Sequence, residues 1–269
     1  MGELLPAGYS DVDGSADPDL LLDSMDVTGR WPAVQALHAW TMPFLSGHDA
    51  VLEVGCGLGG SLIAIAAANP AGRYVGIDLS ESMVAEARRR ANDVGVAAEF
   101  RTGDATVLDF PDDEFDAVRA ERVLQWLPDP RAAVAEMIRV TRPGGRIVLL
   151  DTDWRTFGNT LDPELMQRVK AIGAPQPTPH AGGFLRHWLT TLGAEAVEAR
   201  AEVHHATTWA GDGTDGLPPD DIVTEALLAR GIEPADAEAR TRGLHEQSDA
   251  ATLSIVLTMW AATGTAPGI

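Results

Sequence analysis

A run of glycines broken by one cysteine is the part of this sequence best suited to bind a ligand. Glycine allows the chain to turn sharply and lets main-chain N–H groups approach a ligand closely. A helix that begins after such a turn offers unpaired N–H groups to an anion. This stretch therefore predicts a loop that holds a carboxylate or a phosphate. Its candidate residues are Glu53, Gly55, Cys56, Gly57 and Gly59.

Two acidic residues follow later, each at the expected end of a strand. Asp78 comes 23 residues after Gly55 and is followed by Leu79 and Ser80. A carboxylate at that place can accept hydrogen bonds from both hydroxyls of a ribose. Asp104 comes after Gly103, where a missing side chain would let the main chain pass close to a flat base. The pair predicts a nucleoside site, although Asp78 could instead cap the helix after it.

Strands and helices must alternate to bring these residues together. Short apolar runs predict strands at 50–54, 74–77, 98–102, 115–120 and 146–151, with helices at 61–68, 80–94 and 130–140. This spacing predicts a parallel sheet with helices on both faces. Ligands then bind at the carboxyl ends of the strands, where the glycines and acids lie.

The later part of the chain is less regular. We expect a helix near 184–192, a polar helix over 222–247, and late strands at 195–208 and 251–261. A helical pattern also runs from about residue 20 to residue 45. If His204 and His205 lie on a strand, they point to opposite faces and cannot bind one metal ion together.

Composition excludes several classes of function. Forty acidic and 20 basic residues leave a formal charge of −20, which disfavours nucleic acid and anionic membranes as partners. No apolar run reaches the roughly 18 residues that cross a bilayer, and the N-terminus lacks signal-peptide features. One cysteine cannot form an internal disulfide. We therefore expect a cytoplasmic protein, a monomer or homodimer, that binds a small molecule.

Several motifs together resemble one family. They are E-V-G-C-G-L-G, G-I-D-L-S, G-D-A, E-R-V-L-Q-W-L-P-D-P and R-P-G-G-R-I-V-L-L-D, within about residues 50–151. In this combination the chain resembles the class I S-adenosylmethionine-dependent methyltransferases, in the small-molecule branch of natural-product and quinone-type enzymes. The resemblance implies an α/β, Rossmann-like, mostly parallel seven-stranded sheet. It also implies an N-terminal helical lid and an insertion after the fifth strand.

The resemblance also implies roles for individual residues. The glycines would wrap the methionine part of S-adenosylmethionine, with Glu53 near its ammonium group. Asp78 would hold the ribose, and Asp104 would meet the adenine amine. The positions that would complete the cofactor site are Leu79, Met83, Gly103, Ala105, Glu121 and Arg122.

Acceptor chemistry decides whether a base is needed. A nucleophile that carries a proton must lose it during methyl transfer. The candidates are His38, Glu121, Asp153, His180 and His187. We favour Glu121 and His180, the latter because it precedes two glycines where relatives place a loop over the substrate, although a loop histidine is more often a surface residue. No cluster has the spacing of a metal site, so we expect metal-free chemistry.

Aromatic residues are the candidates for a hydrophobic acceptor cavity: Trp31, Trp126, Trp154 and Phe157. Tryptophans at helical spacing are more often ordinary core. Trp154 is the strongest candidate because it is expected just past the end of a strand. Trp126 departs from the family, in which similar proteins often carry histidine there; tryptophan supplies apolar area and a face that favours cations.

The domain boundaries and two alternative functions complete the sequence expectations. We expect a flexible arm over 1–19, a helical lid over 20–48, and the methyltransferase domain over 49–269, with an insertion at about 152–193. The first alternative is a cyclase or rearrangement catalyst that keeps the S-adenosylmethionine pocket. The second is a nicotinamide-dependent oxidoreductase, because Gly55, Gly57 and Gly60 also satisfy G-x-G-x-x-G. The Pro-Gly-Gly turn at 143–145 disfavours the second.

Overall fold

The computed structural model describes residues 12–14, 28–160, 176–212, 217, 219–228 and 231–268. The chain divides into two compact units. The sheet unit comprises residues 36–153, 176–202 and 259–269, and the second unit comprises residues 1–35, 154–175 and 203–258. Most of the expected arm and the start of the expected lid fall outside the described residues.

Strands and helices alternate as the sequence predicted. In chain order the elements are α2 (Pro32–Thr41), η2 (Met42–Phe44), β1 (Ala50–Val54), α3 (Gly60–Ala68), β2 (Arg73–Asp78), α4 (Glu81–Asp93), β3 (Glu99–Thr102), β4 (Phe115–Glu121), η3 (Leu124–Trp126), α5 (Pro130–Val140), β5 (Thr141–Asn159), α7 (Ala181–Thr191), β6 (Glu195–Ala206), α8 (Asp220–Leu228), α9 (Pro234–Asp249) and β7 (Ile255–Thr265).

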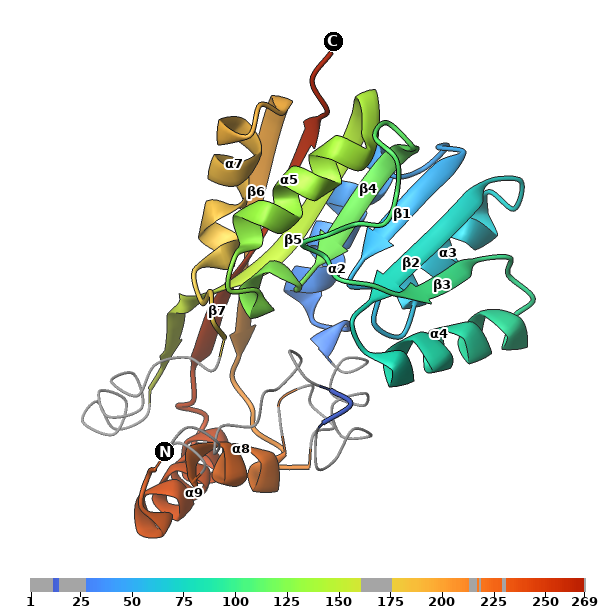
Figure 1. Cartoon of the computed structure of the whole chain (residues 1–269). Helices are drawn as coiled ribbons and strands as arrows, with labels where there is room; N and C mark the ends of the chain where they lie inside the picture. The colour runs from blue at the N-terminus through green and yellow to red at the C-terminus, as the bar shows by residue number, and fades with distance from the viewer. Residues whose placement is uncertain are drawn as a thin grey trace. The chain divides into compact units, whose positions relative to one another are not determined.

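The strands of the described residues form a seven-stranded sheet in the order β3-β2-β1-β4-β5-β7-β6. The pairs β1–β2, β1–β4, β2–β3 and β4–β5 are parallel. Figure 1 shows α5 and α7 on the viewer's side of the sheet, with α2 and α3 behind it. The predicted α/β fold, with a mostly parallel sheet and helices on both faces, is confirmed.

Burial explains why β1 is so apolar. All five of its residues are buried, as expected for a central parallel strand covered on both faces. Met137 of α5 and Leu189 of α7 are fully buried in the same hydrophobic core as Phe115 of β4. This core holds the carboxyl ends of the central strands in fixed positions.

The fifth strand is longer than predicted. It was expected at 146–151, but β5 runs from Thr141 to Asn159 and so includes Trp154. The expected Pro-Gly-Gly turn is an irregularity within this strand, because the register against β4 shifts between Phe115 and Ala117. Gly144 takes a positive φ of 76°, which glycine adopts without steric cost. Trp154 therefore does not lie past the end of the strand.

Two other boundaries were wrong. The helix expected over 222–247 is two helices, α8 and α9, because Gly231 has a positive φ of 76° and Pro234 begins the next helix. The strand expected at 251–261 is β7, which begins at Ile255. Ala251, with φ at 55°, turns the chain after α9. Each error lies where a helix stops, which short-range sequence patterns place poorly.

Candidate active site

Four strands bring the predicted binding residues to one edge of the sheet. Val54 of β1 pairs with Ile77 of β2 and with Ala120 of β4. Asp78 pairs with Thr102 at the end of β3. Because all these strands are parallel, the residues that follow them lie at the same carboxyl edge. The glycine loop, Asp78, Gly103 and Glu121 are therefore neighbours in the sheet unit.

The glycine loop has a shape that only glycine accepts. Gly55, Gly57 and Gly59 have φ values of 66°, 49° and 75°. A Cβ on Gly55 would lie 2.2 Å from Val123 Cγ2, and one on Gly59 would lie 2.8 Å from the Phe100 ring. Both conformation and space exclude a side chain at these two positions. The loop then enters α3, whose first turn offers N–H groups to an anionic group.

Asp78 is joined to the glycine loop by a hydrogen bond. Its Oδ2 accepts a hydrogen bond from Gly57 N at 2.8 Å, and its Oδ1 accepts one from Ser80 N at 3.0 Å. The cap of α4 is made by Ser80, whose Oγ accepts from Met83 N at 3.1 Å. A carboxylate has about four acceptor positions, and one at the end of a strand can accept from ribose hydroxyls. The residues present fit an adenosyl ligand.

The adenine side of the site is open. Leu79 is 63% exposed beside Asp78, whereas Met83 is only 2% exposed and packs in the interior. Asp104 is exposed, and its Oδ1 accepts from Thr106 N and Oγ1 at 2.8 and 2.7 Å. A Cβ on Gly103 would come no closer than 3.6 Å to another protein atom. Protein packing therefore does not require glycine at 103.

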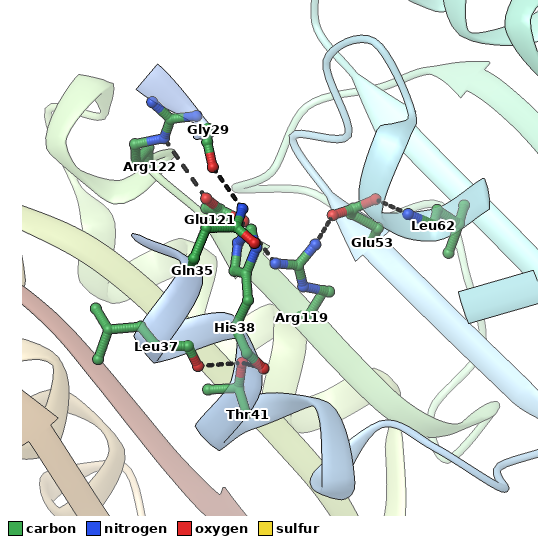
Figure 2. Close-up of polar contacts among 10 residues, drawn as sticks. All are labelled: Gly29, Gln35, Leu37, His38, Thr41, Glu53, Leu62, Arg119, Glu121 and Arg122. Carbon is green, nitrogen blue, oxygen red and sulfur yellow. Dashed lines mark hydrogen bonds and ion pairs between the residues drawn. The ribbon is translucent and has the colours of Figure 1, made fainter. Parts of the chain in front are cut away.

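A chain of charged side chains crosses the site, as Figure 2 shows. Glu53 is buried and accepts from Leu62 N at 3.1 Å and from the Arg119 guanidinium. The same guanidinium donates to Glu121 Oε2 at 2.6 Å. His38 Nε2 lies 2.7 Å from that oxygen. This group of four residues, the buried charge chain, links β1, β4 and α2.

Burial and charge determine the protonation of this chain. Burial by itself would raise the pKa of Glu121, but the hydrogen bond with His38 and the charges of Arg119 and Arg122 hold its pKa well below the ordinary value. Burial raises the pKa of Glu53, which Arg119 only partly offsets. Burial also works against the charge of Arg119, yet Glu53 and Glu121 raise its pKa. Glu121 is thus a carboxylate at neutral pH.

Arg122 has an unusual backbone conformation at this edge. Its φ is 55°, its N–H donates to Leu150 O at 2.8 Å, and its Nε lies 3.7 Å from Glu121 Oε1. A non-glycine residue in the left-handed region is uncommon, and such strain concentrates at functional sites. Trp126 follows in η3 and is half-buried. The predicted pair Glu121-Arg122 therefore lies at the site edge, although its role toward a ligand stays a prediction.

His180 lies at the start of α7, held near η3 by the residues before it. Thr178 N donates to Gln125 O at 3.0 Å, and Thr178 Oγ1 donates to Leu127 O at 2.7 Å. The His180 ring packs against Phe184, with the ring centroids 4.8 Å apart. Among the described residues no hydrogen bond orients this ring. Its catalytic assignment stays a prediction.

The second unit contains Trp31, Trp154 and Phe157, three of the four aromatic acceptor candidates. Trp31 and Phe157 are partly buried against a hydrophobic cluster that includes Trp209 and Leu244. Trp31 also stacks on His204, with the ring centroids 3.9 Å apart. This packing agrees with a core role, and the acceptor-cavity role of these residues stays a prediction.

One residue of the buried charge chain was missed by sequence reasoning. Arg119 was not singled out, whereas His38 was named among the candidate bases without a partner. A period of two within the strand motif Arg119-Ala120-Glu121 places the two charges on one face, which could have identified Arg119. Nothing in the sequence around His38 indicates its partner 83 residues away.

As predicted for adjacent strand residues, His204 is buried and His205 is exposed.

Comparison with known proteins identifies the family. A family described as "Methyltransferase domain" matches residues 52–149. The demethylmenaquinone methyltransferase of Beutenbergia cavernae is 34% identical over 207 residues, which cover 74% of this chain and 79% of that protein. The chain belongs to the class I S-adenosylmethionine-dependent methyltransferases. The prediction made from the motifs is confirmed.

Other known proteins resemble this methyltransferase in sequence or in fold. The 37.1 kDa protein of transposon TN4556 from Streptomyces fradiae is 45% identical over 143 residues. That match covers 52% of this chain and only 41% of the transposon protein. The YcgJ protein of Bacillus subtilis has a similar fold, with a TM-score of 0.62 at 20% identity over 87% of this chain and 99% of that one. The nicotinamide alternative finds no support among these proteins.

Two further observations concern other kinds of site. In the described part of the chain, no helix is long and apolar enough to cross a membrane. Within the same residues, no group of three His, Cys, Asp or Glu side chains could hold a metal ion.

Proposed function

We propose that this methyltransferase modifies a hydrophobic, ring-containing small molecule. Similar proteins are named for quinone precursors, such as the demethylmenaquinone methyltransferases, and for a natural product, 27-O-demethylrifamycin SV. The formal charge of −20 argues against polyanionic acceptors. A quinone or a related natural product is compatible with both observations, and we propose a role in specialised metabolism.

The carboxyl edge of the sheet supplies the cofactor site in this proposal. Gly55, Gly57 and Gly59 let the main chain surround the methionine part, and Asp78 binds the ribose hydroxyls. Bound S-adenosylmethionine supplies an electrophilic methyl group on a positively charged sulfur. The protein orients the acceptor in line with that methyl group, which is chiefly a positioning task. Asp104 and the open position at Gly103 leave room for the adenine base.

The observation that carries the proposal is the junction between the glycine loop and Asp78. Gly57 N donates to the carboxylate at 2.8 Å, so the loop that would hold the methionine part and the acid that would hold the ribose form one rigid piece. A preformed site of this kind loses little entropy on binding. The junction thus favours one ligand that spans both halves.

Two measurements test the function. Calorimetry with S-adenosylmethionine should show binding, and mass spectrometry with hydroxylated quinones, phenols and macrocyclic alcohols should show products heavier by one methylene unit. Binding without any methylated product, but with conversion of an acceptor to an isomer, would instead support the cyclase alternative. Absence of binding by natively folded protein would contradict the proposal.

A further inference from the structure

His38 of α2 lies beside Glu121 at the carboxyl edge of β4, next to the glycine loop of β1. The His38 side chain is 24% exposed, whereas Glu121 is 11% exposed. We propose that His38 accepts the proton of the acceptor molecule during methyl transfer and that Glu121 positions it. This inference rests on the proposed function and adds a residue and a substrate class to it.

The partner of Nε2 determines the form of the imidazole. Glu121 is ionised, and an ionised carboxylate can only accept hydrogen bonds. The nitrogen 2.7 Å from its Oε2 must therefore carry the hydrogen. In neutral imidazole the other nitrogen, Nδ1, then carries the lone pair. Among the described residues, no protein donor occupies Nδ1, so it is available to an acceptor molecule.

Glu121 itself is poorly suited to take a proton. Its Oε2 already accepts from Arg119 and His38, and Arg122 lies 3.7 Å from Oε1. Despite its burial, the hydrogen bond with His38 and the charges of Arg119 and Arg122 hold the pKa of Glu121 well below its ordinary value. A base works best when its pKa lies near the working pH. The structure therefore favours a positioning role over the role of base predicted for Glu121.

The rest of the buried charge chain holds Glu121 in place. Arg119 is 2% exposed and bridges Glu121 to Glu53, which in turn accepts from the first turn of α3. Rotation of this buried carboxylate would break its ion pair with Arg119 and its hydrogen bond with His38, which is costly. The imidazole is thus oriented through contacts that end in α3, the helix that directly follows the glycine loop. His180 lacks any comparable connection among the described residues.

The proposed step balances in atoms and charge. The hydroxyl oxygen of the acceptor forms a bond to the methyl carbon while the carbon–sulfur bond breaks and its electron pair stays on sulfur. The hydroxyl proton moves to His38 Nδ1, giving an imidazolium whose charge is stabilised by Glu121. Because His38 is partly exposed, the proton then passes to water. A hydroxyl acceptor fits this step, because its proton must leave as the oxygen is methylated, and the proposal therefore commits to O-methylation.

The test compares His38→Gln with a matched control, His48→Gln, which lies before β1 at the opposite end of that strand. Glutamine can still donate to Glu121 but is not a base. Labelled S-adenosylmethionine is offered with a panel of phenols, hydroxyquinones and aliphatic alcohols. We expect His38→Gln to lower kcat about 100- to 10,000-fold, with cofactor affinity by calorimetry within about twofold of the original. We expect His48→Gln to change neither.

Further variants separate a chemical role from a structural one. Imidazole added to His38→Ala should restore part of the rate. Glu121→Gln should move the acid limb of the pH–rate profile to lower pH, because the imidazolium loses its neighbouring carboxylate while Arg119 and Arg122 remain nearby. A His38→Gln enzyme with the original kcat and pH profile would overturn the inference while leaving the proposed function intact.

Failure of the proposed function gives a different pattern. Loss of S-adenosylmethionine binding in the unmodified protein contradicts that function directly. If the cofactor binds but no panel member is methylated, nitrogen NMR of labelled histidines decides the matter. The inference predicts a neutral His38 ring at pH 8 with hydrogen on Nε2 and none on Nδ1. Hydrogen on Nδ1 at that pH would overturn it.

Discussion

Asp78 is the central residue of the proposed cofactor site. Its two oxygens already bind Gly57 N and Ser80 N, so the side chain is oriented before any ligand arrives. If Asp78 binds the ribose as proposed, little further ordering of this side chain is needed on binding.

Replacement of Asp78 should therefore weaken cofactor binding. We expect Asp78→Asn to lower the affinity for S-adenosylhomocysteine at least tenfold, because one hydrogen bond to a charged group contributes about 1.5–3 kcal/mol. Calorimetry measures the change, with Asp109→Asn as an exposed control. Unchanged affinity in a folded Asp78→Asn protein would contradict the ribose assignment.

Alanine substitutions at two glycines of the site should have different effects on protein stability and on cofactor binding. Gly55→Ala should lower the free energy of unfolding by about 2–4 kcal/mol, because it adds a Cβ 2.2 Å from Val123 at a positive φ. Gly103→Ala should change the free energy of unfolding by less than about 1 kcal/mol, since its new atom meets only ordinary contacts. It should nevertheless weaken cofactor binding if adenine lies against it. Urea unfolding and calorimetry check both variants.

Among the elements, β5 and η3 are joined by a buried acid. Asp151 of β5 accepts from Gln125 N of η3 at 3.1 Å and from Thr152 N at 2.8 Å. Burial raises the pKa of Asp151 to about 7, although these N–H groups and Arg122 favour the charged form. The native protein thus holds a proton on Asp151 at pH values where the unfolded chain has lost it.

The difference between the native and unfolded pKa of Asp151 predicts how the free energy of unfolding changes with pH. Between the ordinary carboxyl pKa of about 4 and the native value, the native state binds the extra proton, so the free energy of unfolding falls as pH rises. Because asparagine does not titrate, Asp151→Asn removes this fall in the free energy of unfolding. Relative to the original protein, the variant should gain about 2–3 kcal/mol of stability between pH 5 and pH 8. Urea unfolding at both pH values measures it, and a difference independent of pH would refute the assignment.

At the scale of the whole molecule, charge repulsion opposes folding. Forty acidic residues face 20 basic ones, and many of the basic residues already form ion pairs such as Arg89–Asp93 and Arg139–Glu136. Excess negative charge destabilises a compact state through self-repulsion, which salt screens over about 10 Å at 0.1 M.

Added salt should consequently stabilise this protein. We expect Tm at pH 8 to rise by a few degrees when NaCl is increased from about 10 mM to about 150 mM. Near the isoelectric point of about 4.5 the same change should have little effect. Scanning calorimetry checks this, and a Tm at pH 8 that falls with salt would show that the surface ion pairs outweigh the repulsion.

Individual strands and loops show how much of the fold could be predicted from the sequence. Strands β1, β2 and β4 and the glycine loop were predicted closely, because each is determined by residues that are neighbours in the chain. The Pro-Gly-Gly stretch was misplaced because its role as an irregularity in β5 depends on pairing with β4 and on hydrogen bonds between residues 144–145 and Ala266. No local pattern contains that distant partner.

The sequence by itself determined the family, the parallel sheet and the position of the glycine loop, since apolar period, glycine spacing and strand-end acids are local properties of the chain. Only the tertiary structure decided which charged groups meet. Glu53 and Arg119 are 66 residues apart, and His38 and Glu121 are 83 apart. Their pairing follows from burial, because a charge removed from water must find an opposite charge, and the fold determines which one lies within reach.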